Sequence, residues 1–521
     1  MPSEIPGPGN RPNQGSVYLI TSDGRTLSLP IPSDSLNDPL RWSLLRRSLA
    51  LASMSMFTVV SLIIVQGTSL FLGQLGNEYS SIPFRIDMLS SIPCLFWGIG
   101  AVIWVPLCLA IGRRPVFLLC TLILTGACFV AAVSQSFYVH LTARCMQGLA
   151  GAISPSVMIL MIIDMTYIHQ RPLYIALFWC FTTVLSNIGL ALTPLIISAG
   201  GSWRAFYWVW LVPSALTIFL ALFGCPETYF KRYPISFDGH ILAQYENGKT
   251  TIYTNWGEVP KGKPLPVEPT VWKAGSVAKN IIFWNRTTTE GWQAVSAFPK
   301  QLLICVCNPL ILWVLILNAL IFGGMVLTCS TYAEVLQEPP YNFSFQNIGL
   351  AKVSPAIGAM LAFLSSGILT RQSIHFLAKR NRGVREPEHY VPSFILPVIT
   401  SSISLGLFAM AVHRQWDWRW ILLFVGLDYF SAISVFVSVA LWVTEAFPLW
   451  AGPAIVVVGA GGYGLSFALS FGIMPRANSE GLAKTYIELG LLTLIVGLVG
   501  LPVNYWGARF RNYIYSKWTQ E

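Results

Sequence analysis

Residues 48–70 read SLALASMSMFTVVSLIIVQGTSL, a stretch that contains no charged side chain. The hydrocarbon core of a bilayer is about 30 Å thick, and a helix crosses it with roughly 20 apolar residues. This stretch meets that requirement, so it is predicted to be a membrane-spanning helix. Eleven further runs of similar length and character follow: 87–109, 116–134, 138–163, 173–199, 204–224, 302–330, 347–369, 392–412, 419–443, 452–474 and 485–507. The sequence therefore predicts an all-α membrane protein with twelve transmembrane helices.

The composition of the whole chain agrees with this prediction. Apolar residues make up 54% of the 521 residues and charged residues only 11%, whereas a soluble domain carries roughly 25% charged residues. The net charge of +10 does not indicate a nucleic-acid partner, because the Lys and Arg residues lie between the apolar runs rather than in one basic patch. The ten cysteines form no CxxC pair and no cluster with histidine, so neither a metal site nor a cofactor is predicted.

The runs are arranged as two groups of six, a pattern typical of carriers built from two six-helix halves. The predicted parts are an N-terminal tail, a first half, a linker, a second half and a C-terminal tail, at residues 1–47, 48–224, 225–301, 302–507 and 508–521. Each half is expected to supply one wall of a central cavity.

The two longest polar segments have different expected structures. Within the linker, apolar residues flank the turn-like pair Asn247-Gly248, which predicts a small hairpin around Ile241–Tyr253. Residues 1–30 are rich in Pro, Gly, Asn and Ser, so we expect them to be disordered.

The orientation in the membrane follows from the basic residues of the loops, which accumulate on the cytoplasmic side. With the N-terminus inside, the cytoplasmic segments hold nine basic residues between 225 and 300 and five between 371 and 391. They also hold Arg41, Arg46, Arg47, Arg113, Arg114, Arg171, Arg509, Arg511 and Lys517. Both termini are therefore predicted to be cytoplasmic. Residues 1–47 contain no early apolar core, so no signal peptide is expected.

Arg144 is a charged residue inside the run 138–163, where charges are rare and usually functional. It occurs in the pattern Leu141-x-x-Arg144-x-x-Gln147-Gly148. Arginine stays charged at physiological pH, so it cannot itself carry a proton, although it can hold an anionic or carbonyl group. We predict that Arg144 takes part in proton coupling and that Gln147 lies near the cavity. The alternative is a purely structural hydrogen-bond hub.

Asp428 is the acid that lies deepest in an apolar run. It follows Arg419 by nine residues, which places it about 14 Å into the membrane at a helical rise of about 1.5 Å per residue. Carrier sites are expected near that depth. We predict Asp428 as the proton-translocating carboxylate, with a buried packing acid as the alternative.

Neutral polar residues within the predicted helices are candidates for binding a substrate in the cavity. Gln66, Asn187 and Asn318 could face the cavity, or they could equally join neighbouring helices by hydrogen bonds. Tyr332, with Trp97 and Trp104, could stack on an aromatic or cationic substrate, although packing is the more common role for such side chains.

Two turns on the cytoplasmic side are candidate gates. Gly112-Arg113-Arg114-Pro115 lies after the second run, and Asp164, His169 and Arg171 lie after the fourth. Such residues can pair with acids and so lock one conformation, or they can simply anchor the loops by positive charge.

Two glycosylation sequons are present. Asn342-Phe-Ser lies in a predicted outer loop, and Asn342 is therefore a candidate glycosylation site. Asn285-Arg-Thr is predicted to be cytoplasmic and therefore unusable.

Several further motifs are spread along the chain: Leu29-Pro30-Ile31-Pro32, Asn37-Asp38-Pro39-Leu40-Arg41-Trp42-Ser43, Phe96-Trp97-Gly98, Pro106, Trp203-Arg204, Pro226-Glu227-Thr228 and Arg382-Gly383-Val384-Arg385-Glu386-Pro387-Glu388. With these motifs and the two turns, the chain from about residue 27 to 515 resembles fungal drug:proton antiporters of the major facilitator superfamily. The resemblance is strongest to the subgroup that contains polyamine and cation carriers. It implies the major facilitator architecture and proton-coupled transport.

The chain departs from that family pattern at two positions. The turn after the second run usually has an acid three residues before its glycine, and here that position is Leu109. The antiporter motif G-x-x-x-G-P reads Gly189-Leu-Ala-Leu-Thr193-Pro194 in this chain. Because that motif is linked to antiport, the direction of transport is the least supported part of the resemblance.

The leading hypothesis is a plasma-membrane carrier that exports a drug, toxin or secondary metabolite by alternating access and proton exchange. Its partners would be a small organic substrate, protons and the lipid bilayer, and it would act as a monomer. The alternatives are proton-coupled uptake of a cation or polyamine, which would favour several acids in the cavity, and a transporter-like receptor that moves no cargo. No paired carboxylates, nucleophile elbow or phosphate loop occurs outside the apolar runs, so an enzyme is not expected.

Overall fold

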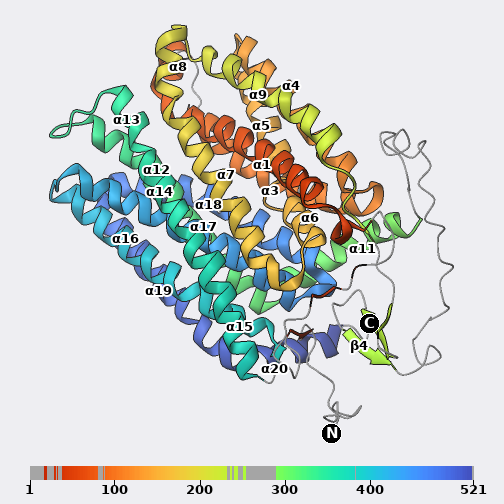
Figure 1. The fold of residues 1–521 in the computed structure, drawn as a ribbon. Coiled ribbons are helices and arrows are strands. Elements are labelled where there is room, and N and C mark those ends of the chain that lie inside the picture. The colour runs from red at the N-terminus through yellow and green to blue at the C-terminus, as the bar shows by residue number, and fades with distance from the viewer. Residues whose placement is uncertain are drawn as a thin grey trace.

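A computed structural model describes residues 17–19, 28–30, 32, 38–79, 86, 88–230, 235–237, 240–244, 250–253, 289–381 and 383–518. The protein is a bundle of long helices, with α8 and α13 at one end and α15, α20 and the short strand β4 at the other (Figure 1). The predicted all-helical membrane fold is confirmed.

The first half contains helices that follow the predicted runs closely. They are α1 (Leu44–Gly67), η2 (Thr68–Phe71), α2 (Leu72–Glu78), α3 (Met88–Ile111), α4 (Arg113–Val133), α5 (Phe137–Gly151), α6 (Val157–Met165), η3 (Ile168–Gln170), α7 (Arg171–Ala191), α8 (Thr193–Gly200) and α9 (Arg204–Gly224). A short 3-10 helix, η1 (Pro39–Arg41), precedes α1, and the side chain of Asp38 caps it.

The second half repeats this arrangement. Its elements are α12 (Pro309–Gln337), α13 (Phe345–Ala351), α14 (Val353–Ala362), the π-helical segment η5 (Phe363–Leu369), α15 (Thr370–Arg380), η6 (Pro387–Phe394), α16 (Ile395–His413), α17 (Trp418–Ala446), η7 (Pro448–Trp450), α18 (Ala451–Glu480), α19 (Leu482–Leu498) and α20 (Gly500–Trp518).

Eleven helical stretches of the described chain are long and apolar enough to cross a membrane. The predicted run 138–163 is not among them, because it is divided into α5 and α6 by a turn at residues 152–156. Pro155 lies in this turn and has no N–H to donate to a continuous helix. The fourth predicted span is therefore a broken helix.

The start of the second half differs from the sequence prediction. The run 302–330 was expected to be one helix, but α11 (Thr289–Val306) ends within it and α12 begins at Pro309. Asn308 causes this break, because its side chain accepts a hydrogen bond from the N–H of Leu310 and so caps α12. Much of α11 lies in the segment predicted as the linker, where α11 packs against α3 and α18.

The linker contains the predicted hairpin. Strands β2 (Ile235–Phe237), β3 (His240–Gln244) and β4 (Thr250–Tyr253) form an antiparallel sheet in which Ile241 pairs with Tyr253. The predicted turn at Asn247-Gly248 and the sequon at Asn285 lie outside the described residues.

The expectation of disorder in residues 1–30 is wrong where the structure describes that segment. Strand β1 (Val17–Tyr18) pairs antiparallel with β5 (Val384–Arg385) in the second half. The carbonyl of Leu29 accepts a hydrogen bond from the N–H of Ile168 in the first half. The described parts of the N-terminal segment therefore contact both halves at one end of the bundle. The remainder of residues 1–30 is not described.

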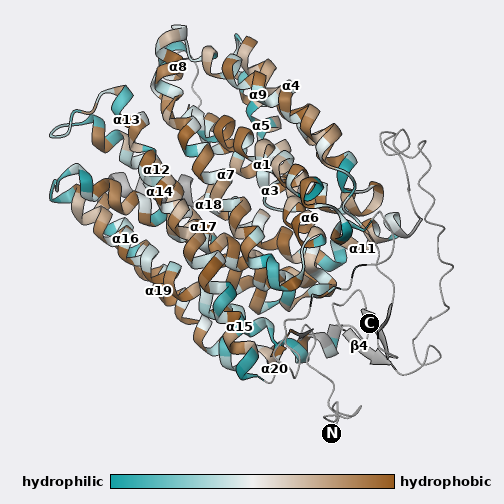
Figure 2. Cartoon of the chain, viewed as in Figure 1, coloured by the Kyte–Doolittle hydropathy of each residue, from teal (hydrophilic) through white to brown (hydrophobic). Residues whose placement is uncertain are grey.

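Hydrophobic residues cover most of the length of the helices, and hydrophilic residues gather near their ends (Figure 2). Large apolar side chains remain exposed on the outside of the bundle, among them Val212, Phe223, Leu350 and Ile495. Soluble monomers rarely expose apolar surface on this scale, whereas lipid covers it in a membrane. The chain is thus a multi-pass membrane protein.

The two halves contact each other along two pairs of helices, α3 with α18 and α7 with α14. Gly98 permits one of these approaches, since a Cβ atom there would lie 3.0 Å from the carbonyl oxygen of Ala460. Following the predicted orientation, we call the end that carries β1, β5 and α11 the inner end, and the end that carries α8 and α13 the outer end.

Candidate substrate cavity

A cavity with about 490 Å³ of empty space lies between the two halves. Its lining comes from α1, α3, the α5–α6 turn and α7 in the first half, and from α12, α17 and α18 in the second: Ser61, Leu62, Gln66, Trp97, Ser154, Pro155, Trp179, Thr183, Phe322, Met325, Tyr429, Ile433, Phe436 and Tyr463. A second space of about 340 Å³ shares Trp179 and Phe436 with it and extends toward the inner end.

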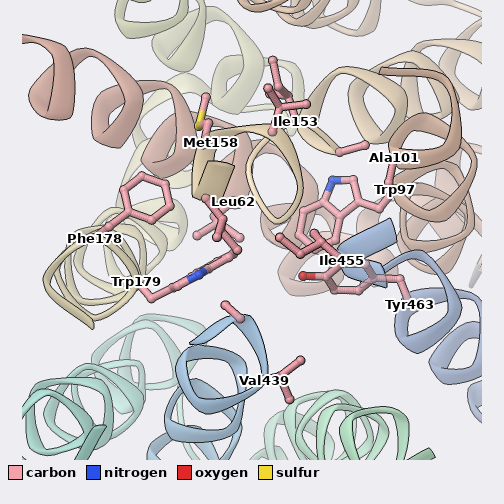
Figure 3. Packing of buried hydrophobic residues seen from close by; sticks show 14 of the residues in the cluster. Leu62, Trp97, Ala101, Ile153, Met158, Phe178, Trp179, Val439, Ile455 and Tyr463 are labelled. Carbon is pink, nitrogen blue, oxygen red and sulfur yellow. The ribbon is translucent and has the colours of Figure 1, made fainter. Parts of the chain in front are cut away.

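Aromatic rings form much of the lining. The rings of Trp97 and Tyr463 lie 4.9 Å apart, and Phe322 lies 4.9 Å from Tyr463 on its other side. Trp179 stacks on Phe436 across the two halves, with 5.4 Å between the ring centres. Figure 3 shows Trp97 beside Tyr463 and the indole of Trp179 below Leu62. The walls are therefore suited to a flat or apolar molecule.

Three buried polar atoms in the lining have no hydrogen-bond partner among the residues that the structure describes. They are the indole Nε1 atoms of Trp97 and Trp179 and the hydroxyl of Ser61. The Ser61 hydroxyl and the Trp97 Nε1 atom both lie against Gly151 of α5, where a Cβ atom would be 2.5 Å from each of them. Trp104, by contrast, donates to the carbonyl of Leu149 and packs inside the first half.

The cavity is closed at the inner end by a buried ion-pair cluster around Glu445. Its Oε1 atom accepts from Arg171 of the first half at 2.5 Å, and its Oε2 atom accepts from Arg385 at 2.5 Å. Burial alone would lower the pKa of Arg385, but the carboxylate of Glu445 raises it above its ordinary value. Sequence reasoning missed Glu445, because the run was predicted to end at residue 443, whereas α17 extends to Ala446.

The first predicted gating turn is held together within the first half. Gly112 adopts a positive φ of 97° before α4, and the carboxylate of Glu227 accepts hydrogen bonds from the N–H groups of Arg113 and Arg114. The side chain of Arg114 also donates to the carbonyl of Leu222 at 2.7 Å. Glu227 thus caps the N-terminus of α4, whose first two residues lie between Gly112 and Pro115.

The second predicted turn has two connections. Asp164 forms an ion pair with Arg113, which joins the two turns to each other. His169 stacks on Tyr167 with 5.8 Å between ring centres. Arg171 contacts Glu445 and so reaches the second half.

Arg144 lies in a fully buried hydrogen-bond network. Its guanidinium donates to the carbonyl oxygens of Ile64 and Val65 in α1 and of Leu89 in α3, at 2.6–2.8 Å. It also donates to Oε1 of Gln147, whose amide group in turn donates to the carbonyl of Ala127 in α4. Neither Arg144 nor Gln147 lines the two cavities. This geometry favours the structural-hub alternative.

Asp428 is buried inside the second half. One carboxylate oxygen accepts from the hydroxyl of Thr328 at 2.8 Å, and the other oxygen, Oδ1, has no hydrogen bond of ordinary geometry with the described part of the chain. Asp428 does not line the cavity, but the adjacent residue Tyr429 does. Asp428 and Arg144 lie in different halves, and the structure does not bring them together at the cavity.

The neutral candidates are divided between the cavity and the helix packing. Gln66 lines the main cavity and Asn318 the inner one, where its amide also donates to the carbonyl of Val458 at 3.3 Å. Asn187 and Tyr332 line neither cavity, and within the described residues Oδ1 of Asn187 is buried without a hydrogen-bond partner.

The predicted glycosylation site lies in an accessible loop. Asn342 is exposed between α12 and α13, with a positive φ of 50°. Ser344, the third residue of the sequon, uses its hydroxyl to cap α13.

The family model described as "Major Facilitator Superfamily" matches residues 48–471. The chain is 24% identical to the uncharacterized MFS-type transporter C1271.10c of Schizosaccharomyces pombe, over 96% of this chain and 90% of the relative. It is also 24% identical to protein HOL1 of Saccharomyces cerevisiae, over 94% and 91% of the chains. The MFS-type transporter penM of Penicillium rubens is 24% identical over 92% and 88%.

Two solved structures have a similar fold. The proton:xylose symporter XylE matches with a TM-score of 0.57 and 13% identity, over 90% of this chain and 99% of XylE. The human organic anion transporter MFSD10 matches with a TM-score of 0.55 and 14% identity, over 87% and 99%. At these identities the likeness shows the shared fold.

Proposed function

Since the chain belongs to the Major Facilitator Superfamily, we propose that it is a secondary active transporter that exports a small organic compound across the plasma membrane in exchange for protons. The observation that carries this proposal is the aromatic cavity between the two halves, with contacts between the halves at both ends.

The contacts at the two ends support alternating access, in which the halves rock about a central site. At the inner end, Arg171 of the first half pairs with Glu445 of the second. At the outer end, Gly349 of the second half lies so close to the first that a Cβ atom there would be 2.7 Å from the carbonyl of Ala191. Separation of one contact while the other holds would open the cavity to one side only.

The lining supports a compound that is partly apolar and able to accept hydrogen bonds. Stacked rings favour flat apolar groups, and the indole N–H of Trp179, which has no partner among the described residues, favours an acceptor atom on the cargo.

We retain Asp428 as the proposed proton site. It forms no salt bridge with a described residue, so it can exchange a proton without breaking an ion pair there. It adjoins Tyr429, which faces the cavity, so a change around the carboxylate can reach the bound cargo. Arg144 has the proposed role of fixing α1, α3 and α5 relative to one another.

Import in place of export is the second candidate. The incomplete motif Gly189-Leu-Ala-Leu-Thr193-Pro194, with threonine in place of the second glycine, favours this alternative. A cation or polyamine as the imported compound is less favoured, because no Asp or Glu occurs in the lining of the two described cavities.

The test is proton movement in proteoliposomes against a panel of aromatic drugs, polyamines and fungal metabolites, with wild type, Asp428→Asn and the control Glu338→Gln. Glu338 is an exposed acid at the end of α12. The expected result is a cargo-dependent proton flux that is lost in Asp428→Asn and kept in the control. A flux that survives in Asp428→Asn removes Asp428 as the proton site. The absence of flux and of cargo movement with every compound refutes transport and favours a receptor.

A further inference from the structure

We propose that Lys352 and Tyr332 form a binding site for an anionic group, and that the carried compounds are therefore organic anions such as carboxylates. This inference rests on the proposed transport function and specifies the chemical class of its cargo. It starts from the distribution of buried positive charge.

Five Lys and Arg side chains are buried in the described part of the chain: Arg113, Arg144, Lys352, Arg385 and Arg511. Three of them form ion pairs: Arg113 with Asp164, Arg385 with Glu445, and Arg511 with Glu388. Arg144 donates to a ring of carbonyl and amide oxygens. Lys352 is the exception, because it forms no salt bridge with any described residue.

Lys352 lies at the junction of α13 and α14 and is only 3% exposed. Its ammonium group lies 5.3 Å from the centre of the Tyr332 ring. Such a cation–π contact compensates a buried charge only in part, and unpaired charge at membrane depth is rare and usually functional. The position therefore favours a counter-ion that comes from outside the chain.

Tyr332 provides a second indication of a ligand. Its side chain is fully buried, and its hydroxyl, which faces the Lys352 ammonium group, forms no hydrogen bond of ordinary geometry with a described residue. A buried hydroxyl without a partner is destabilising, because it has lost its water and gained nothing in exchange. An ammonium group and a phenol hydroxyl are both donors, and together they match the oxygen atoms of a carboxylate.

The Lys352–Tyr332 pair does not line the cavity, but α12 connects the pair to it. On α12, Met325, Cys329 and Tyr332 occur at intervals of four and three residues, so they share one face of the helix. Met325 lines the cavity, and Tyr332 follows it by seven residues, about 10 Å along the helix. The Sγ atom of Cys329 lies 3.2 Å from the hydroxyl of Tyr429, another lining residue.

The outer contact between the halves lies directly beyond the pair. Gly349, which closes against Ala191, precedes Lys352 by one helical turn. When this contact separates, Lys352 becomes the first buried charge that a compound meets from the outer side. The cargo's anionic group would bind there, while its aromatic part would lie between Trp97, Trp179 and Phe436.

The proposal is tested with two matched pairs of probes that differ in charge and hardly in shape: 1-naphthoate with 1-naphthamide, and benzoate with benzamide. Binding to the purified full-length protein is measured by calorimetry. The expected result is that each carboxylate binds at least about 10-fold more tightly than its amide, since a charged hydrogen-bonded pair is typically worth that much.

Variants assign the preference to the site. Lys352→Gln is expected to abolish the preference for carboxylates, Lys352→Arg to retain most of it, and Tyr332→Phe to reduce it several-fold. Lys484→Gln is the matched control, because it removes a lysine charge that is exposed and paired with Glu480. If Lys352→Gln does not fold, the proposal is still tested by Lys352→Arg, by Tyr332→Phe and by the carboxylate–amide comparison on the wild type.

The outcomes separate this inference from the proposed transport function. Equal binding of acid and amide by wild type, no binding of either carboxylate, or a preference that persists in Lys352→Gln overturns the anion site. If proteoliposomes then still accumulate neutral or cationic compounds, the transport function stands without the anion site. If binding of naphthoate depends on Lys352 but no probe crosses the membrane, the site stands and transport fails.

Discussion

The guanidinium of Arg144 contacts backbone carbonyl groups of α1 and α3, and it holds Gln147 in position to contact α4. A charged residue in an apolar run could be recognised from the sequence, but its partners could not. Carbonyl groups occur at every residue, so only the three-dimensional approach of the helices decides which of them Arg144 binds. The distinction between a hub and a proton-coupling residue therefore required the structure.

We predict that Arg144→Lys lowers stability more than it changes transport. Lysine has only three donor hydrogens, whereas Arg144 makes four hydrogen bonds. Each buried acceptor left unpaired costs about 1–3 kcal/mol. The thermal unfolding temperature in detergent should fall by several degrees, while molecules that remain folded keep their transport rate. Arg419→Lys, at an exposed position, should change neither. An unchanged unfolding temperature with lost transport would show that Arg144 acts on the cargo or the proton.

Glu445 forms ion pairs with two arginines at the inner end, and its replacement should open that end. Glu445→Gln removes the charge that pairs with Arg171 and Arg385, and breaking a buried ion pair in this way typically costs about 3–5 kcal/mol. The reporter is a cysteine at Ala440, which lines the inner cavity, in a chain without native cysteines. Its labelling by an impermeant reagent from the inner side should rise at least about tenfold.

The matched control for this prediction is Glu480→Gln. Glu480 pairs with Lys484 at an exposed position, so its replacement should leave the labelling unchanged. Unchanged labelling in Glu445→Gln would refute the assignment of this cluster as the inner closure.

At the scale of elements, apolar runs of sufficient length predicted most of the helices. They did not predict the break at residues 152–156 or the boundary at Asn308, because a run of apolar residues continues across both. The pairing of Val17–Tyr18 with Val384–Arg385 was equally out of reach, since it joins segments from opposite ends of the chain. Composition alone indicated disorder there, but a partner strand supplies the missing backbone hydrogen bonds.

Gly349 permits α13 and α8 to meet at the outer end, so a larger side chain should prevent closure there. In Gly349→Val, the Cβ atom would lie 2.7 Å from the carbonyl of Ala191 and 2.9 Å from Pro194. We expect transport to fall at least tenfold, while the protein remains folded with its outer end open. Gly406→Val is the control, because a Cβ atom at Gly406 meets nothing within 4 Å. Normal transport by Gly349→Val would show that the halves do not need this contact.

The N-terminal strand should stabilise the inner closure, because β1 binds the segment that carries Arg385 and the carbonyl of Leu29 binds Ile168 close to Arg171. Deletion of residues 1–19 removes the strand's hydrogen bonds, which contribute about 1 kcal/mol each. Labelling of the cysteine at residue 440 from the inner side should rise several-fold in the deleted protein. A deleted protein with labelling equal to that of the full chain would show that β1 does not contribute to closure.

At the scale of the whole molecule, the two-half arrangement places one cavity between two closures. The sequence predicted the halves and Gln66 as a cavity residue, but not the aromatic wall formed by Trp179 and Phe436. Aromatic residues are frequent throughout the apolar runs, and only the packing of the halves selects those that face the cavity. Asp428 and Lys352 illustrate the same limit. Their depth in an apolar run follows from the sequence, but the helix that each side chain faces does not.

The central claim is that this cavity opens to the two sides of the membrane in turn. It is tested most directly with a cysteine at Thr183, a lining residue, in a chain without native cysteines, labelled by an impermeant reagent in vesicles of each orientation. We predict labelling from both sides in wild type. Glu445→Gln should raise labelling from the inner side and lower it from the outer side, and Gly349→Val should have the opposite effect. Labelling from one side only in all three proteins, or a rise from both sides together, would contradict alternating access.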